Sequence, residues 1–144
     1  MSIGDSVTEI YFRVFRGCEK LSTLTIGENV KVIRSEAFKD CVSLKNLSIP
    51  DSVESIQGNA FDGYSSLKEL TIPENVTTLG AGAFQNCTDL RDIRLMGSKL
   101  KLENEVFLNV APDASIRTSY HLLKPVFSEL LARDEVTHQI SKLQ

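Results

Sequence analysis

The fold is decided by one stretch of sequence, LKNLSIPDSVESIQGNAF, which spans residues 44–61. Within Leu47–Ile49 apolar and polar residues alternate, which is the pattern of a strand with one buried face. Pro50 then begins a turn that ends the strand. Val53–Ile56 is expected to form a second, shorter extended segment, and Asn59–Asp62 a tight helical turn that places a phenylalanine in the core. The stretch therefore predicts one closed circuit of chain.

The same pattern returns 23 residues later, where residues 67–84 read LKELTIPENVTTLGAGAF. Five phenylalanines form the clearest column at this period: Phe15, Phe38, Phe61, Phe84 and Phe107. The other large apolar columns are Leu21, Leu44, Leu67, Leu90; Leu24, Leu47, Leu70, Ile93, Ile116; Ile3, Ile26, Ile49, Ile72, Leu95; and Ile10, Ile33, Ile56, Leu79, Leu102. Because one circuit cannot bury its apolar face alone, the repeat predicts circuits that stack, with their strands in a parallel sheet.

These repeats resemble the leucine-rich repeats of the BspA type. The resemblance is carried by residues 41–56, by Ala60-Phe61, and by the next unit at residues 67–76 and 83–87. It implies a right-handed solenoid with a parallel sheet, and a role in adhesion or protein binding at the surfaces of bacteria and some protists. The chain departs from the family pattern at Tyr64, where a cysteine is usual, and in lacking a signal peptide.

We therefore expect an α/β-type repeat solenoid over residues 1–118, with short turns and helical turns outside the sheet and an incomplete first repeat. Residues 119–144 are expected to form a C-terminal helical cap, because their apolar residues follow helical spacing. The residues with this spacing include Leu123, Phe127, Leu130, Leu131, Val136, Ile140 and Leu143. An amphipathic helix that binds a partner is the alternative for this segment.

The N-terminus begins in mid-repeat, since Ile3 to Ile10 aligns with Ile49 to Ile56. An uncovered coil leaves a strand edge and apolar side chains open, so the chain is either a piece of a longer array or covered there by a partner copy. Tyr11 and Phe12 stand where later repeats carry polar or small residues. They either cover the first coil locally or form an end-stacking contact in a homo-oligomer.

Composition narrows the classes of partner. The net charge of -3 and the pI near 5.4 argue against nucleic acid, because phosphate binding needs a basic surface. No apolar run approaches the roughly 20 residues needed to span a bilayer, so membrane insertion is not expected. Without a signal peptide the chain is expected in the cytoplasm if it is complete, and at the cell surface or secreted if it is a fragment.

Residues suited to catalysis are sparse. The two histidines, His121 and His138, are isolated from each other, and Cys18, Cys41 and Cys87 fall in one column of the repeat. That column predicts a ladder of buried thiols rather than nucleophiles or metal ligands. No phosphate-binding loop or nucleophile elbow is present. We expect a protein that is not an enzyme and that uses no metal or cofactor.

The outward residues of the predicted strands form the candidate partner-binding surface. Its members, which we call the strand face, are Lys45, Asn46, Ser48, Lys68, Glu69, Thr71, Arg91, Asp92 and Arg94. They either dock a protein or another cell-surface macromolecule, or form a solvated surface whose basic and acidic columns neutralise each other. The alternative function is a structural spacer, or a self-associating segment of a longer array.

Overall fold

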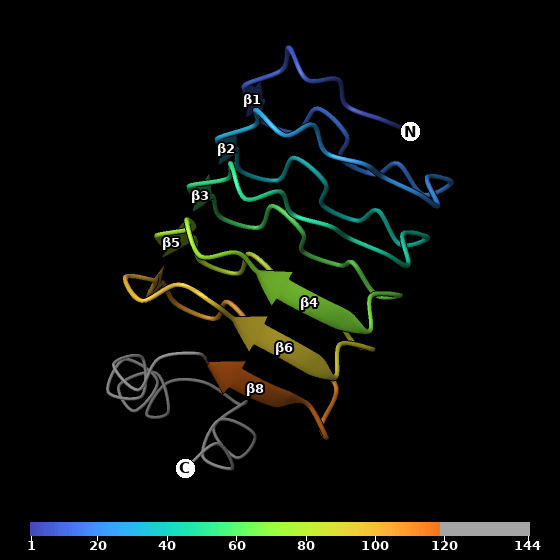
Figure 1. Ribbon diagram of the computed structural model, residues 1–144. Coiled ribbons are helices and arrows are strands. Elements are labelled where there is room, and N and C mark those ends of the chain that lie inside the picture. The colour runs from blue at the N-terminus through green and yellow to red at the C-terminus, as the bar shows by residue number, and fades with distance from the viewer. Residues whose placement is uncertain (119–144) are drawn as a thin grey trace.

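The computed structural model describes residues 1–118, and the predicted cap at residues 119–144 lies outside the described residues. The described chain is a stack of circuits, each 23 residues long, that rise along one axis (Figure 1). We number these coils from the first, residues 3–25, through the third, residues 49–71, to the fifth, residues 95–117. The predicted solenoid with a parallel sheet is confirmed, and its strands form two separate ladders.

The first ladder holds five very short strands in the order β1-β2-β3-β5-β7. Their bounds are β1 Glu9–Ile10, β2 Val32–Ile33, β3 Ser55–Ile56, β5 Thr78–Leu79 and β7 Lys101–Leu102. Every pair of neighbouring strands is parallel. Ile33 pairs with Ile56, and Ile56 in turn pairs with Leu79. Paired residues are therefore one repeat, or 23 positions, apart in the sequence. β3 lies within the extended segment predicted at residues 53–56.

The second ladder has the order β4-β6-β8 and lies toward the viewer in Figure 1. Its strands are β4 Glu69–Ile72, β6 Asp92–Leu95 and β8 Ser115–Thr118. Along β4 exposed and buried residues alternate, with Leu70 and Ile72 facing the core. This alternation is the one that the sequence pattern predicted.

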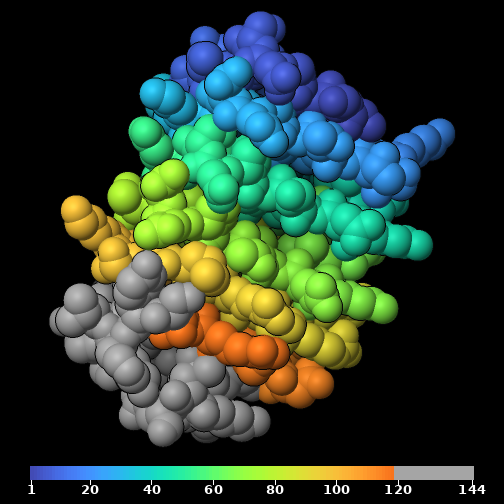
Figure 2. Space-filling model, in the orientation of Figure 1, coloured from blue at the N-terminus to red at the C-terminus, as the bar shows by residue number. Residues whose placement is uncertain are grey.

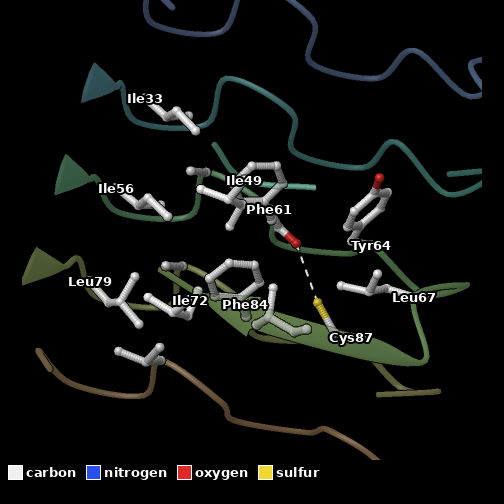
Figure 3. Close-up of a cluster of buried hydrophobic side chains, with 14 of the residues drawn as sticks. Ile33, Ile49, Ile56, Phe61, Tyr64, Leu67, Ile72, Leu79, Phe84 and Cys87 are labelled. Carbon is white, nitrogen blue, oxygen red and sulfur yellow. Dashed lines mark hydrogen bonds between the residues drawn. The ribbon is translucent and has the colours of Figure 1, made fainter. Parts of the chain in front are cut away.

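The two ladders enclose a core built on stacked phenylalanine rings. Successive ring centroids from Phe15 to Phe107 lie 5.1, 5.3, 5.2 and 6.0 Å apart. These spacings are close to the distance of about 4.8 Å between hydrogen-bonded strands, so the rings follow the rise of the backbone. Figure 3 shows Phe61 and Phe84 between Ile56 and Leu79 on one side and Tyr64 and Leu67 on the other. Burial of each such ring contributes roughly 1.5–3 kcal/mol.

The segment before and after each phenylalanine is a series of tight turns, not the helical turn expected at Asn59–Asp62. The N–H of Ala60 donates to the carbonyl of Gln57 (3.3 Å), whereas the N–H of Phe61 donates to Ala83 in the next coil (2.8 Å). Two columns adopt left-handed backbone: Arg13, Glu36, Asn59, Gly82, Glu105, and Gly17, Asp40, Gly63, Asn86, Asn109. Successive N–H groups thus donate in turn to a carbonyl of the same coil and to a carbonyl of the next coil. In a helix the N–H groups donate within the helix, so this segment is not helical.

The side chains of the first coil are more exposed than those of the inner coils. Its apolar residues Ile3, Val7, Phe15, Cys18 and Leu21 are partly buried, whereas their counterparts in the third coil are buried. Tyr11 and Phe12 follow β1 and are 67% and 56% exposed. The guanidinium of Arg13 lies 4.6 Å from the ring centroid of Phe12. Neither aromatic side chain is part of the core, so both remain available for contact.

Candidate functional site

The nine predicted residues of the strand face lie together on one side of the solenoid. Asp92 is half-buried and the other eight side chains are exposed. They come from residues 45–48, from residues 68–71 and from residues 91–94, which stack in successive coils. Figure 2 shows the surface over β4, β6 and β8 from this side. These side chains therefore point outward, as a period of two residues on a strand predicts, and partner binding by them stays a prediction.

The ladder under this face is interrupted between the second and third coils. Isolated parallel bridges link Ser2 to Thr25 and Thr25 to Ser48, and the ladder begins again at β4. Within residues 1–118 no bridge joins Ser48 to Thr71, although their counterparts Thr71 and Arg94 are paired. The strand face thus consists of two parts, one on each side of this interruption.

Tyr64 lies behind the interruption. Its ring is buried, and its hydroxyl donates to the carbonyl oxygen of Asn46 at 3.2 Å. In the same column the thiols of Cys41 and Cys87 donate to the carbonyls of Phe15 and Phe61 at 3.2 and 3.4 Å; Figure 3 shows the contact of Cys87. The longer tyrosine side chain instead reaches the outer strand segment of the preceding coil. The departure from the usual cysteine therefore coincides with the break in the ladder.

A groove of about 1100 Å³ opens at the interruption. Six of the nine predicted residues line it: Lys45, Asn46, Ser48, Lys68, Glu69 and Thr71. The half-buried Leu47, the exposed Met96 and the acidic side chains of Asp51, Glu74 and Asp89 also line it. Sequence reasoning did not include Asp51 and Glu74, although each directly follows the proline that ends a strand. Their recurrence after Pro50 and Pro73 was a usable signal.

Charges are arranged differently in the two parts of the strand face. Around Asp92, arginines form ion pairs, with Arg117 Nη2 at 3.5 Å and Arg94 Nη2 at 4.0 Å. Arg91 Nε lies 3.6 Å from a carboxylate oxygen of Asp113. At the groove, by contrast, Lys45 and Lys68 form no ion pair within the described part of the chain. The C-terminal part of the face therefore holds ion pairs, whereas the two lysines at the groove form none in residues 1–118.

Two thiols of the predicted buried ladder, Cys41 and Cys87, have the chemistry of a buried core, whereas Cys18 is only partly buried. Desolvation raises the pKa of Cys41 to about 11 and raises that of Cys87 as well, so both thiols are neutral at physiological pH. Burial likewise raises the pKa of Tyr64. In the described residues no group of three His, Cys, Asp or Glu side chains is placed to hold a metal ion. His121 and His138 lie outside those residues.

The geometry defines a parallel β-solenoid with 23-residue coils, two ladders and a polar strand face. The chain belongs to the BspA type leucine-rich repeat family, whose repeat matches in six copies over residues 1–111. None of the curated protein sequences matches the chain. In residues 1–118 we find no helix with the length and apolar character that crossing a membrane requires.

Solved structures share the fold. A leucine-rich repeat protein of T. pallidum is 26% identical with a TM-score of 0.76, covering 90% of this chain and 68% of that one. A leucine-rich cell surface protein of Faecalibacterium prausnitzii is 27% identical with a TM-score of 0.66, covering 83% and 38%. The pneumococcal vaccine antigen PcpA, at 21% identity and a TM-score of 0.68, covers 89% and 38% and shows the fold alone. The chain spans well under half the length of the last two proteins.

Proposed function

We propose that this chain is a non-catalytic protein-binding module that recognises a macromolecular partner on its strand face. The observation that carries the proposal is the groove at the break in the ladder, lined by six of the outward residues. Polar side chains carried by a rigid solenoid core are held near one another before binding, which lowers the entropy lost on association. The similar protein of F. prausnitzii is described as a cell surface protein, which supports an adhesion role.

The test compares capture by the wild type and by a Lys68→Ala/Glu69→Ala variant, each immobilised and exposed to the same protein extract. Proteins that the variant fails to retain are identified by mass spectrometry, purified and titrated directly. We expect the variant to lose most of the binding, because both altered side chains line the groove. Circular dichroism and thermal unfolding check that both proteins are folded.

A matched control is offered by the opposite ladder. Lys31 and Glu54 are also one lysine and one glutamate, both exposed, and they precede β2 and β3. The Lys31→Ala/Glu54→Ala variant should bind as the wild type does. Equal binding by all three proteins would rule out the groove part of the strand face as the docking surface.

The second candidate function is a spacer or self-associating segment, favoured by exposed apolar side chains on the first coil. Val14, Tyr11 and Phe12 are 53%, 67% and 56% exposed at this end. Exposed apolar side chains grouped at one end are typical of contact surfaces. Sedimentation over a concentration series tests self-association: a dimer should dissociate in the Tyr11→Ser/Phe12→Ser variant, and a wild-type monomer at all concentrations would contradict self-association.

A further inference from the structure

The column that holds Tyr64 can be compared with the pairing of the outer strand segments, coil by coil. Each member of the column precedes one strand segment, and the members are Cys18, Cys41, Tyr64, Cys87 and Val110. The segments after the first two members are joined to the previous coil by the isolated bridges Ser2–Thr25 and Thr25–Ser48, and those after the last two by the pairs β4–β6 and β6–β8. Within residues 1–118, the segment after Tyr64 is the one that forms no bridge with the previous coil.

Main-chain hydrogen bonds differ in the same way. Between β4 and β6 the N–H groups of Arg91 and Asp92 donate to the carbonyl of Lys68 at 3.0 and 3.2 Å. One coil earlier the equivalent donors are the N–H groups of Lys68 and Glu69, and in the described chain neither donates to the carbonyl of Lys45. The strand segments that line the groove therefore lack the bonds with which the ladder begins in the next coil.

The proline at the end of the strand segment does not by itself explain the missing pair. Pro73 lacks the N–H that Met96 donates at the same position of the next coil. Pro50 lacks it one coil earlier, and a bridge is nevertheless present there. The segment with that bridge follows Cys41, whereas the segment without one follows Tyr64. The residue in the column therefore remains as a cause.

The ring of Tyr64 is held at both of its ends. The side chain is fully buried, and its ring centroid lies 5.9 Å from that of Phe61 (Figure 3). Its hydroxyl donates to the carbonyl of Asn46, which supplies the partner that a buried phenol needs. The thiol of Cys87 is much shorter and donates to the carbonyl of Phe61. Because protein interiors are close-packed, a ring in place of a thiol displaces the segments around it.

We infer that Tyr64 is a positioning residue of the groove: its buried ring holds residues 45–48 and 68–71 apart, and this separation opens the groove. The inference rests on the proposed function for the role of the groove in binding, and it adds the residue that shapes the site from behind. Tyr64 is not among the residues that line the groove. A substitution there can therefore alter the groove while every side chain of the strand face stays in place.

The first experiment measures amide hydrogen exchange by NMR in the wild type and in Tyr64→Cys. The amides of Lys68 and Glu69 should exchange at least about tenfold more slowly in the variant, because they gain the carbonyl of Lys45 as an acceptor. The amide of Arg91, which is already bonded in the wild type, serves as the internal reference. Exchange at Lys68 and Glu69 as fast in the variant as in the wild type would overturn the inference.

Two further variants separate the ring from its hydroxyl and from a loss of folding. Tyr64→Phe keeps the ring and removes the bond to Asn46, so the amides of Lys68 and Glu69 should exchange as in the wild type. Slower exchange in this variant would show that the ring is not the cause. Tyr64→Val replaces Tyr64→Cys if the cysteine variant does not fold, since Val110 occupies the column beside the intact pair of β6 and β8. It should slow both amides as well.

The capture experiment separates this inference from the proposed function. Tyr64→Cys keeps all nine side chains of the strand face and should still lose most of the captured partner, as Lys68→Ala/Glu69→Ala does. Full retention of the partner by a variant whose Lys68 and Glu69 amides are protected would refute the positioning role and leave the proposed function standing. If the wild type captures no protein, the proposed function fails, and the exchange experiment still decides whether the ring opens the groove.

Discussion

The first and third coils carry the same columns of residues but experience different environments. Val14 in the first coil is 53% exposed, whereas Ala60 at the same position of the third coil is fully buried. Phe15 is only partly buried, and Phe61 is stacked between two other rings at 5.3 and 5.2 Å. A coil of this solenoid is therefore stabilised by its neighbours at least as much as by its own sequence.

The largest effect expected from this difference is between the two phenylalanines. Phe61→Ala should lower the free energy of unfolding by about 3–5 kcal/mol, because it opens a cavity in a core that cannot collapse. Phe15→Ala should cost roughly half as much, because part of its ring already contacts solvent. Urea denaturation monitored by circular dichroism measures both changes in the free energy of unfolding. Equal costs would show that the first coil is covered in solution.

A second contrast lies in the column directly after the phenylalanines. In the third coil Asp62 is buried and accepts hydrogen bonds from the side-chain amides of Asn59, Gln85 and Asn86 at 3.2, 2.9 and 3.0 Å. In the first coil the same position is Arg16, whose side chain is 41% exposed. One position of the repeat is thus a buried hydrogen-bond acceptor in one coil and a surface cation in the other.

Asp62→Ala should therefore lower the free energy of unfolding by about 1–3 kcal/mol, since it removes the charged acceptor of three amide hydrogen bonds and the ion-pair partner of Lys39. Arg16→Ala should leave stability within the error of the measurement, because an exposed ion pair contributes little. Thermal unfolding of both variants under one buffer condition gives the comparison. A loss of stability in Arg16→Ala as large as that in Asp62→Ala would contradict the expected difference.

Much of the fold could be predicted because the repeat constrains it strongly. Fixed columns of Phe, Leu and Ile placed the core, and alternation in Leu47–Ile49 identified the outward side chains of the strand face. The column Gly17, Asp40, Gly63, Asn86, Asn109 also carried a readable signal, since these residue types favour left-handed backbone. That signal argued for turns where we expected a helical turn.

Other features could not be predicted because they depend on contacts between coils. Nothing in the sequence around Tyr64 indicates that its hydroxyl reaches Asn46 rather than the carbonyl that the thiols use. The break in the ladder between Ser48 and Thr71 follows from packing in three dimensions. Glutamate has no preference for left-handed backbone, so the conformation of Glu105 is imposed by the stack rather than by the residue.

Because the thiols of the inner coils are buried, we expect the free energy of unfolding to fall at alkaline pH. Because burial raises the pKa of Cys41 from its ordinary 9.0 to about 11, the unfolded chain releases this proton first as pH rises. The stabilisation is therefore fully present below pH 9 and declines between about pH 9 and 11. Cys87 acts in the same direction. Urea midpoints at pH 8 and pH 10 should differ less in Cys41→Ala/Cys87→Ala than in the wild type, and an unchanged difference would refute this.

The smallest expected effect concerns the left-handed column before the phenylalanines. The third and fourth coils place Asn59 and Gly82 there, residues that tolerate positive φ, whereas the fifth coil places the exposed Glu105 at a φ of 60°. Glu105→Gly should therefore raise the free energy of unfolding by about 0.5–1 kcal/mol, because relief of strain exceeds the entropy that glycine adds to the unfolded chain. The matched change Glu103→Gly, an exposed glutamate in the same coil without positive φ, should be neutral or destabilising. If both changes destabilise equally in thermal unfolding, the stack imposes no strain at this position.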